Sequence, residues 1–209
     1  MPAQNKKVFN RILLASLLSF SANSYSVEIA PLLGYRGGGD FIDYTTDQKH
    51  TITSSDIYGV LLSFPYEYGK TLEVYYSHQS SDLRSINITL PSPTNNADIP
   101  LSIDYLHIGG TAPISSESDL KTFISGGLGF TYLSPDFTGL ESDLRPSLSI
   151  GIGLKYPLSR NVAFRLETRG LATMFNNNSS IFCSGGCTIK VDGNLFLQGE
   201  VFAGLAFRF

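Results

Sequence analysis

The chain has 209 residues, of which 15 are basic and 18 acidic, and its net charge is −3. Only 16% of the residues are charged while 42% are hydrophobic, which excludes an intrinsically disordered chain. The acidic balance argues against a nucleic-acid-binding protein. Two cysteines are too few for a disulfide-rich scaffold or a four-thiolate zinc site, and we expect neither a cofactor nor a bound metal.

The N-terminal segment has the three parts of a secretory signal peptide. Basic residues precede an apolar stretch at residues 12–20, and small residues follow up to Ser26. The apolar stretch is too short for a transmembrane helix, which needs about 20 residues. We therefore predict a cleaved signal peptide over residues 1–26, with Ser24 as the alternative cleavage position, and one exported domain over residues 27–209.

Apolar residues alternate with polar or small residues through most of this domain. In residues 147–156, SLSIGIGLKY, every second residue is Leu, Ile or Tyr, and the residues between them are Ser, Gly and Lys. A period of two is typical of a strand with one apolar and one polar face. Eight such strands are predicted, at residues 27–39, 55–64, 71–82, 101–112, 120–133, 145–157, 161–174 and 190–209.

The predicted connections alternate between short and long. Three short ones, PYEYGK, PISSESD and PLSRN, are rich in turn-forming residues, whereas the others, near residues 40–54, 83–100, 134–144 and 175–189, are long and polar. This asymmetry is typical of bacterial outer-membrane barrels. The predicted fold is all-β: a closed antiparallel eight-stranded transmembrane β-barrel with short periplasmic turns and long extracellular loops.

The distribution of side chains favours a membrane barrel over a soluble one. One face of each predicted strand is almost purely apolar, and the other carries Gly, Ser and a few charges, as expected for lipid-facing and lumen-facing surfaces. Aromatic residues mark both ends of the apolar face, as in the two aromatic girdles of such barrels. We place Tyr66, Tyr68, Tyr156, Phe207 and Phe209 at the short-turn end, and Tyr58, Phe130 and Tyr132 at the long-loop end.

The C-terminal residues GLAFRF resemble the signal that outer-membrane insertion machinery recognises, with Gly204, Phe207 and Phe209 at the matching positions. With the signal peptide and the eight strands, the chain resembles the small bacterial outer-membrane β-barrel family of OmpA-like, OmpX-like and opacity-type porin-like barrels. The resemblance implies a cell-surface location in the bacterial outer membrane. It implies contact with outer-membrane lipids and lipopolysaccharide, insertion by the barrel-assembly machinery, and contact of the loops with an extracellular ligand or a host surface.

The polar strand faces predict a group of ionisable side chains in the lumen. These are Arg36, Glu73, His107, Lys155, Arg165, Glu167, Arg169, Glu200 and Arg208. The interior of an eight-stranded barrel is only wide enough for side chains to fill it, and buried charges must pair or remain hydrated. We predict a structural network of ion pairs, in which Glu200 is the nearest partner of residues 165–169. A narrow ion path is the alternative.

Two further motifs could carry chemistry. His78 and Ser80 lie two residues apart at the outer end of the third strand, which resembles the motif of outer-membrane lipid A deacylases. Such an enzyme needs a carboxylate to orient the base, and Asp82 or Glu73 would have to supply it. The Asn that follows the Ser in those enzymes is Ser81 here.

Cys183 and Cys187 form a CSGGC motif in the last long loop, where a disulfide is the favoured interpretation of an exported pair.

The favoured function is a non-enzymatic integral outer-membrane protein with a structural or surface-interaction role through its extracellular loops. The alternatives are a lipid A-modifying enzyme that uses His78 and Ser80, and a narrow pore.

Overall fold

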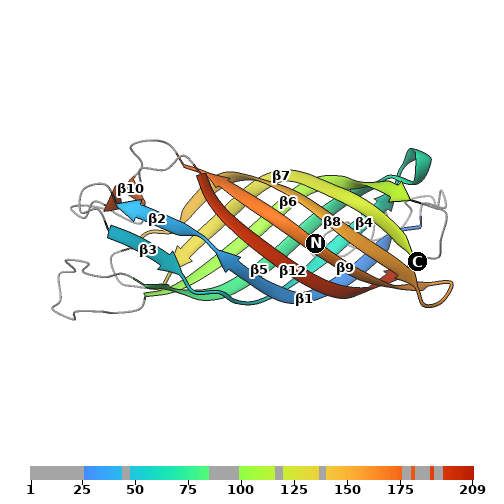
Figure 1. Cartoon of the computed structure of the whole chain (residues 1–209), viewed down its shortest axis with the longest axis horizontal. Helices are drawn as coiled ribbons and strands as arrows, with labels where there is room; N and C mark the ends of the chain where they lie inside the picture. The colour runs from blue at the N-terminus through green and yellow to red at the C-terminus, as the bar shows by residue number, and fades with distance from the viewer. Residues whose placement is uncertain are drawn as a thin grey trace, which may run out of the picture.

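The protein is a closed antiparallel β-barrel (Figure 1). The computed structural model describes residues 26–43, 48–84, 99–115, 120–136, 140–175, 180–181, 189–190 and 195–209. Its eight long strands are β1 (Glu28–Gly38), β4 (Ser55–Pro65), β5 (Thr71–Arg84), β6 (Ile99–Ser115), β7 (Lys121–Pro135), β8 (Asp143–Pro157), β9 (Val162–Met174) and β12 (Leu195–Arg208). β1 pairs with both β4 and β12, so the first and last long strands close the barrel.

The eight predicted strands are confirmed, with boundaries that shift by five residues or fewer. Four short strands were not predicted. β2 (Asp40–Asp43) pairs with β3 (Gln48–Ile52), and the end of β3 pairs with the end of β5. The sheet therefore extends into the segment predicted as the first long loop. β10 (Ser180–Ile181) and β11 (Ile189–Lys190) form a separate small ladder. A strand beyond the lipid needs no continuous apolar face, so the period of two that reveals strands is absent there.

A single turn of 3-10 helix, η1 (Glu67–Gly69), connects β4 to β5. No helix among the described residues has the length and apolar character needed to cross a membrane.

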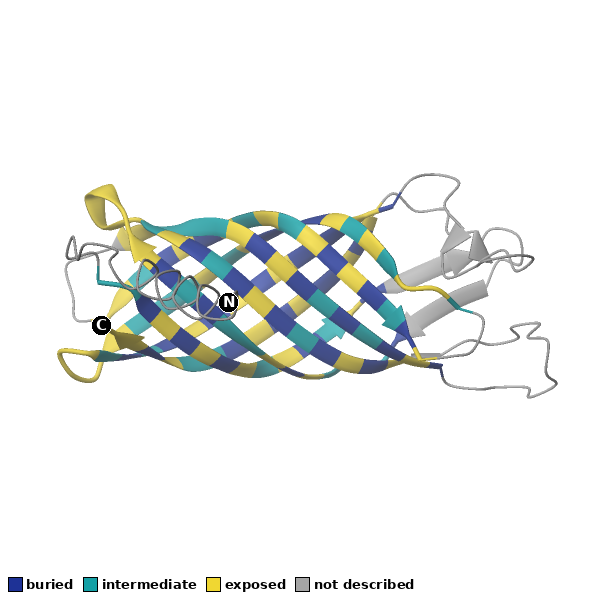
Figure 2. Ribbon diagram, turned by 180° about the vertical axis from the view of Figure 1, so that it is seen from behind, coloured by how far each residue is buried: buried dark blue, intermediate teal, exposed yellow. Residues whose placement is uncertain are grey.

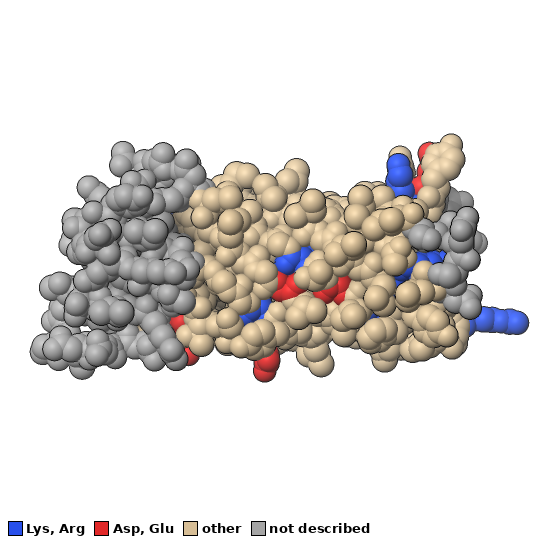
Figure 3. Space-filling view, viewed as in Figure 1, with Lys and Arg blue, Asp and Glu red and all other residues tan. Residues whose placement is uncertain are grey.

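The barrel wall has two different faces, and buried residues alternate with more exposed ones along most of each long strand (Figure 2). Leu33, Leu128 and Ile150 point outward and are 73%, 71% and 70% exposed. A wall of exposed Leu and Ile is suited to contact with lipid rather than water. The face shown in Figure 3 is mostly uncharged over the part of the chain that the structure describes. The aromatic residues predicted at the two ends of the wall are all exposed.

The lumen is filled by side chains in two kinds of layer. Buried apolar residues, including Leu101, Leu133 and Phe196, lie at the strand ends next to the long loops. Buried charged residues from β1, β5, β9 and β12 lie further along the barrel. The predicted lumen of Gly, Ser and charges was therefore incomplete, because it lacked this apolar layer.

Candidate functional site

Alternation along β9 places three charged residues inside the barrel. Arg165, Glu167 and Arg169 are all at most 5% exposed, whereas Leu166 and Thr168 between them point outward. The register pairs β9 with β12 so that Arg169 lies opposite Glu200, as the order of the strands predicts. β9 therefore supplies two cations and one anion to the interior.

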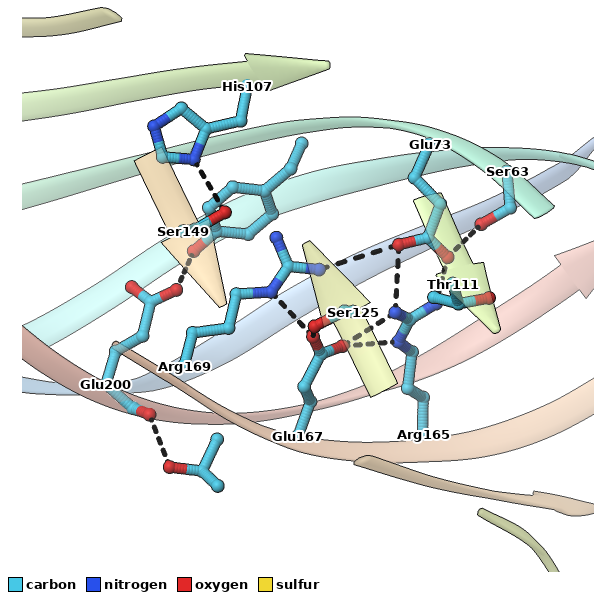
Figure 4. A network of polar contacts seen from close by, with 12 residues as sticks. Ser63, Glu73, His107, Thr111, Ser125, Ser149, Arg165, Glu167, Arg169 and Glu200 are labelled. Carbon is cyan, nitrogen blue, oxygen red and sulfur yellow. Dashed lines mark hydrogen bonds and ion pairs between the residues drawn. The ribbon is translucent and has the colours of Figure 1, made fainter. Parts of the chain in front are cut away.

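Arg165 crosses the barrel to reach Glu73. Its two terminal nitrogens donate to the two carboxylate oxygens of Glu73 at 2.7 and 3.0 Å (Figure 4). Three strands separate β5 from β9 in either direction around the barrel, so this bidentate pair joins opposite walls. Arg165 also donates to Glu167 on its own strand at 2.6 Å. Bidentate pairs of this kind are both strong and geometrically specific.

Arg169 completes the same cluster. Its Nε donates to Glu167 at 2.6 Å, and its Nη2 lies 3.5 Å from Glu73. The hydroxyl of Ser125 donates to Glu167 at 2.5 Å, and that of Ser63 donates to Glu73 at 3.1 Å. Both carboxylates thus receive several donors, which a buried carboxylate requires.

Glu200 belongs to a neighbouring cluster. Arg36 on β1 donates to Glu200 at 2.6 and 2.9 Å, and the Tyr75 hydroxyl donates to it at 2.6 Å. Arg36 also donates to Ser77. The prediction that Glu200 is the nearest carboxylate partner of residues 165–169 was wrong: the ion pairs found there go to Glu73 and Glu167, because the arginines extend across the lumen instead of sideways.

The two clusters together balance three arginines against three glutamates, which makes their summed charge zero. Aromatic rings lie against the guanidinium groups. Arg169 lies over the Tyr75 ring at 4.3 Å from its centroid, and Arg36 lies over the Tyr105 ring at 4.6 Å. Such stacking stabilises a cation in a site with little water.

A neutral hydrogen-bonded layer accompanies the charges. His107 contacts the hydroxyl of Ser147 at 2.8 Å and that of Ser149 at 3.1 Å, so it joins β6 to β8 without an ion pair. Tyr105 donates to the side chain of Gln198 at 2.9 Å, from β6 to β12 on the opposite side of the barrel. The Tyr105–Gln198 hydrogen bond therefore crosses the lumen, as the Arg165–Glu73 pair does.

Lys155 does not join the central clusters. It donates to Glu28 near the short-turn end, and the half-exposed Arg208 lies 3.7 Å from the same carboxylate. Glu28 is thus the partner of both cations at this end of the barrel.

Several residues of the network were not singled out from the sequence: Glu28, Tyr75, Gln79, Tyr105 and Gln198. Each lies an even number of residues from the other inward-facing residues of its strand, so the alternation in the sequence already indicates that it faces the lumen. Their partners are not encoded in the alternation, because a period of two gives the face of a residue but not its height in the barrel.

A separate polar cluster lies on the outward face. His78 Nδ1 lies 2.8 Å from Asp104 Oδ1, and His78 Nε2 lies 3.1 Å from Ser80 Oγ. The register pairs His78 on β5 directly with Asp104 on β6. The sequence prediction that Asp82 or Glu73 would orient His78 was wrong. Glu73 faces the lumen, and Asp104 supplies the carboxylate from the neighbouring strand.

Two tyrosines surround this cluster. The hydroxyl of Tyr76 donates to Asp104 at 2.8 Å, and the ring of Tyr58 lies 5.0 Å from the imidazole of His78. The alternation along β6 could have shown that Asp104 faces outward, because it lies two residues before Leu106 and four before Ile108, which are both exposed.

The residues of the predicted assembly signal lie at the short-turn end of β12. Phe207 and Phe209 are exposed, and the Phe209 backbone N–H donates to the carbonyl of Val27 at 3.0 Å. A Cβ at Gly204 would lie 2.4 Å from the carbonyl oxygen of Pro31, so the neighbouring strand leaves no room for a side chain there. Recognition of this segment by insertion machinery stays a prediction.

The predicted disulfide of Cys183 and Cys187 lies outside the described residues, as does the signal peptide up to residue 25. Among the residues that are described, no group of three or more His, Cys, Asp or Glu side chains could hold a metal ion.

Comparisons with known proteins show the fold. The chain resembles the outer membrane protein OprG from Pseudomonas aeruginosa, with a TM-score of 0.61, 9% identity and coverage of 88% of this chain and 96% of that one. It also resembles Neisserial surface protein A, with a TM-score of 0.54, 15% identity and coverage of 88% and 97%. No family model matches the sequence. A search of curated proteins found no match.

The chain therefore has the fold of the small bacterial outer-membrane β-barrels. Its apolar outer wall agrees with this fold, because a closed barrel leaves no unpaired strand edge in lipid. This fold agrees with the resemblance of the sequence to the small bacterial outer-membrane barrels.

Proposed function

We propose that this barrel, which shares the fold of the small outer-membrane proteins, is a closed scaffold and not a pore. The observation that carries the proposal is the bidentate pair between Arg165 and Glu73, which joins opposite walls of the barrel. A passing ion would have to separate that pair or squeeze past it.

Three further features support a sealed lumen. The central charges are mutually neutralised, so they offer no net field to attract one kind of ion. Tyr105 and Gln198 cross the lumen at another level. Buried apolar side chains such as Leu101 and Leu133 occupy the end next to the long loops. An interior of eight strands leaves little space beyond such side chains.

Planar-bilayer recording tests this proposal. The purified wild-type protein should give no stepwise conductance in 1 M KCl. The double variant Glu73→Ala, Arg165→Ala removes the transverse pair and should give small, unstable steps. A reproducible unit conductance of the wild-type protein would contradict the closed scaffold and favour the narrow pore. Migration of the unheated protein on an SDS gel checks that both samples are folded.

Because the lumen is sealed, other molecules contact the protein on its outer surface. We propose that residues 27–209 remain after removal of the signal peptide, and that the extracellular loops contact an external ligand or host surface. Binding and catalytic residues commonly lie on loops held by a rigid scaffold. Shortening the segment at residues 83–100 should alter surface binding by whole cells while the barrel still folds and reaches the outer membrane.

A further inference from the structure

We propose that Ser80, His78 and Asp104 form a hydrolytic site on the lipid-facing wall, which cleaves fatty-acyl esters of lipids in the outer leaflet. The site is separate from the lumen network and goes beyond the proposed scaffold function. Its three side chains come from two adjacent strands and all point away from the barrel axis.

The order of the contacts is the order that nucleophilic catalysis requires. Asp104 contacts Nδ1 of His78 at 2.8 Å, which favours the tautomer with a proton on that nitrogen. The other ring nitrogen then has a free lone pair, and it lies 3.1 Å from the hydroxyl oxygen of Ser80. A base that a carboxylate orients and that contacts a hydroxyl is the arrangement that activates a serine.

The sheet holds this geometry rigidly. His78 and Asp104 are directly paired across β5 and β6, and Ser80 is the next residue of β5 on the same face. The Tyr76 hydroxyl fixes Asp104, and the Tyr58 ring packs against His78. Sites built on strands and locked by surrounding contacts are more precise than sites on loops.

The depth of the site points to the outer leaflet. From Thr71 to His78 the chain advances about 24 Å along the strand, at roughly 3.4 Å per residue. With a strand tilt of about 40°, this is roughly 18 Å along the axis of an apolar band about 25 Å tall. His78 is paired with Tyr58 on one side and with Asp104 on the other, and Asp104 is paired with Tyr132. Tyr58 and Tyr132 belong to the aromatic residues at the long-loop end of the barrel. Acyl esters of outer-leaflet lipids lie near this level.

Ionisable side chains are also unusual on an apolar, lipid-facing wall. The His78 and Asp104 side chains are 18% and 23% exposed, between exposed apolar neighbours such as Leu106. Ionisable groups on a lipid-facing surface cost free energy and are usually retained for function. Three polar groups linked in series are therefore better explained by chemistry than by stability.

The reaction balances with water as the only co-reactant. Ser80 Oγ adds to the ester carbonyl carbon while His78 Nε2 takes its proton. The carbon–oxygen bond to the alcohol then breaks, and the alcohol leaves with that proton. Water at the membrane surface attacks the acyl-serine and gives a proton to His78. His78 passes that proton to Ser80 Oγ as the bond between the acyl carbon and Ser80 breaks, and the fatty acid leaves. Asp104 positions the imidazole and stabilises its protonated form.

The first test uses purified, folded protein in detergent micelles. p-Nitrophenyl dodecanoate is the ester probe, and a long-chain fluorophosphonate is the covalent probe, which forms an oxygen–phosphorus bond with an activated serine and releases fluoride. We expect the wild-type protein to hydrolyse the ester and to carry the fluorophosphonate on Ser80, identified by mass spectrometry of the labelled peptide.

Variants separate the site from its surroundings. Ser80→Ala and His78→Ala should each lower the rate by about 1,000-fold or more, as loss of a nucleophile or its base does in serine hydrolases. Asp104→Asn should lower it by a similar factor. Ser134→Ala is the matched control, since Ser134 lies on the outward face of β7 and pairs with Ser142, and it should retain the wild-type rate.

The second test identifies the source of the ester. Wild-type protein and Ser80→Ala are incubated with vesicles of lipopolysaccharide or of phosphatidylethanolamine, and released fatty acids are measured by mass spectrometry. Ser80-dependent release from either vesicle supports the proposal and names the lipid. Absence of release from both, labelling of a different serine, or an unchanged rate in Ser80→Ala would overturn it.

Discussion

Glu73 is the residue on which the central lumen cluster depends most, because it accepts hydrogen bonds from Arg165 across the barrel and lies beside Arg169. Glu73→Gln would leave two buried guanidinium groups with Glu167 as their remaining carboxylate in that cluster. Breaking a buried ion pair by removing one partner costs about 3–5 kcal/mol. We expect a loss of this size in urea unfolding in detergent micelles, followed by circular dichroism.

Glu67→Gln is the control for this change. Glu67 lies in the exposed turn η1, so its neutralisation should alter the unfolding free energy by about 0.5 kcal/mol or less. Equal unfolding midpoints for the two variants would mean that the Glu73 network contributes nothing to stability.

Tyr75 tests the second cluster. Its hydroxyl donates to Glu200 at 2.6 Å, so Tyr75→Phe removes one of the donors that satisfy this buried carboxylate. We expect a loss of about 1–3 kcal/mol by the same unfolding measurement. Tyr35→Phe should change stability by about 0.5 kcal/mol or less, because Tyr35 is exposed and its hydroxyl bonds to the carbonyl of Ser54 on the outer wall. The reverse ranking would contradict the assigned bond.

At this scale the sequence predicted faces but not partners. The alternation of Arg165, Glu167 and Arg169 with apolar residues was enough to place them inside. It could not predict Glu73 as the partner of Arg165, because that pair depends on the relative heights of strands on opposite walls. Parity marks Asp104 as outward-facing but does not identify it as the partner of His78, because the number of residues between β5 and β6 does not fix the register of the two strands.

Among the elements, β6 and β7 approach each other closely at two glycines. A Cβ at Gly109 would lie 1.9 Å from the carbonyl oxygen of Gly126, and a Cβ at Gly129 would lie 1.9 Å from that of Leu106. No real Cβ atom tolerates such a distance, so the strands would have to move apart. The glycines of this strand pair are therefore part of its packing.

Gly109→Ala should lower stability by about 1–3 kcal/mol, the usual cost of overpacking a close contact. The matched variant is Gly199→Ala, since a Cβ at Gly199 meets nothing within 4 Å. It should leave the urea midpoint unchanged or slightly raised. If Gly109→Ala unfolds at the wild-type midpoint, the close approach of β6 and β7 is not a feature of the folded protein.

The long strands were predictable because lipid on one side and a packed lumen on the other impose a strict period of two. In β8, residues 147–156 alternate without exception. The signal weakens where that constraint ends. β2 and β3 continue the sheet beyond the predicted strands, and their sequences, DFID and QKHTI, lack a sustained alternation.

The whole molecule combines an apolar exterior with an interior that holds charged and polar layers beside apolar ones, whereas a soluble barrel has a polar exterior. Both proposals depend on this division. A sealed lumen needs Glu73, Arg165 and their partners inside, and an outward hydrolytic site needs His78, Ser80 and Asp104 outside. Because β5 contributes to both, a slip of one residue in its register would turn Glu73 outward and turn His78 and Ser80 inward.

Accessibility scanning of β5 tests this arrangement most directly. Single cysteines introduced at residues 72, 74 and 76, and at residues 75, 77 and 79, would carry a nitroxide spin label, with Cys183 and Cys187 replaced by Ser. In lipid bilayers, we predict high collision rates with oxygen at the even positions and low rates with both oxygen and a water-soluble nickel chelate at the odd positions. High oxygen accessibility at the odd positions would contradict the assignment of faces, and with it both the sealed lumen and the outward site.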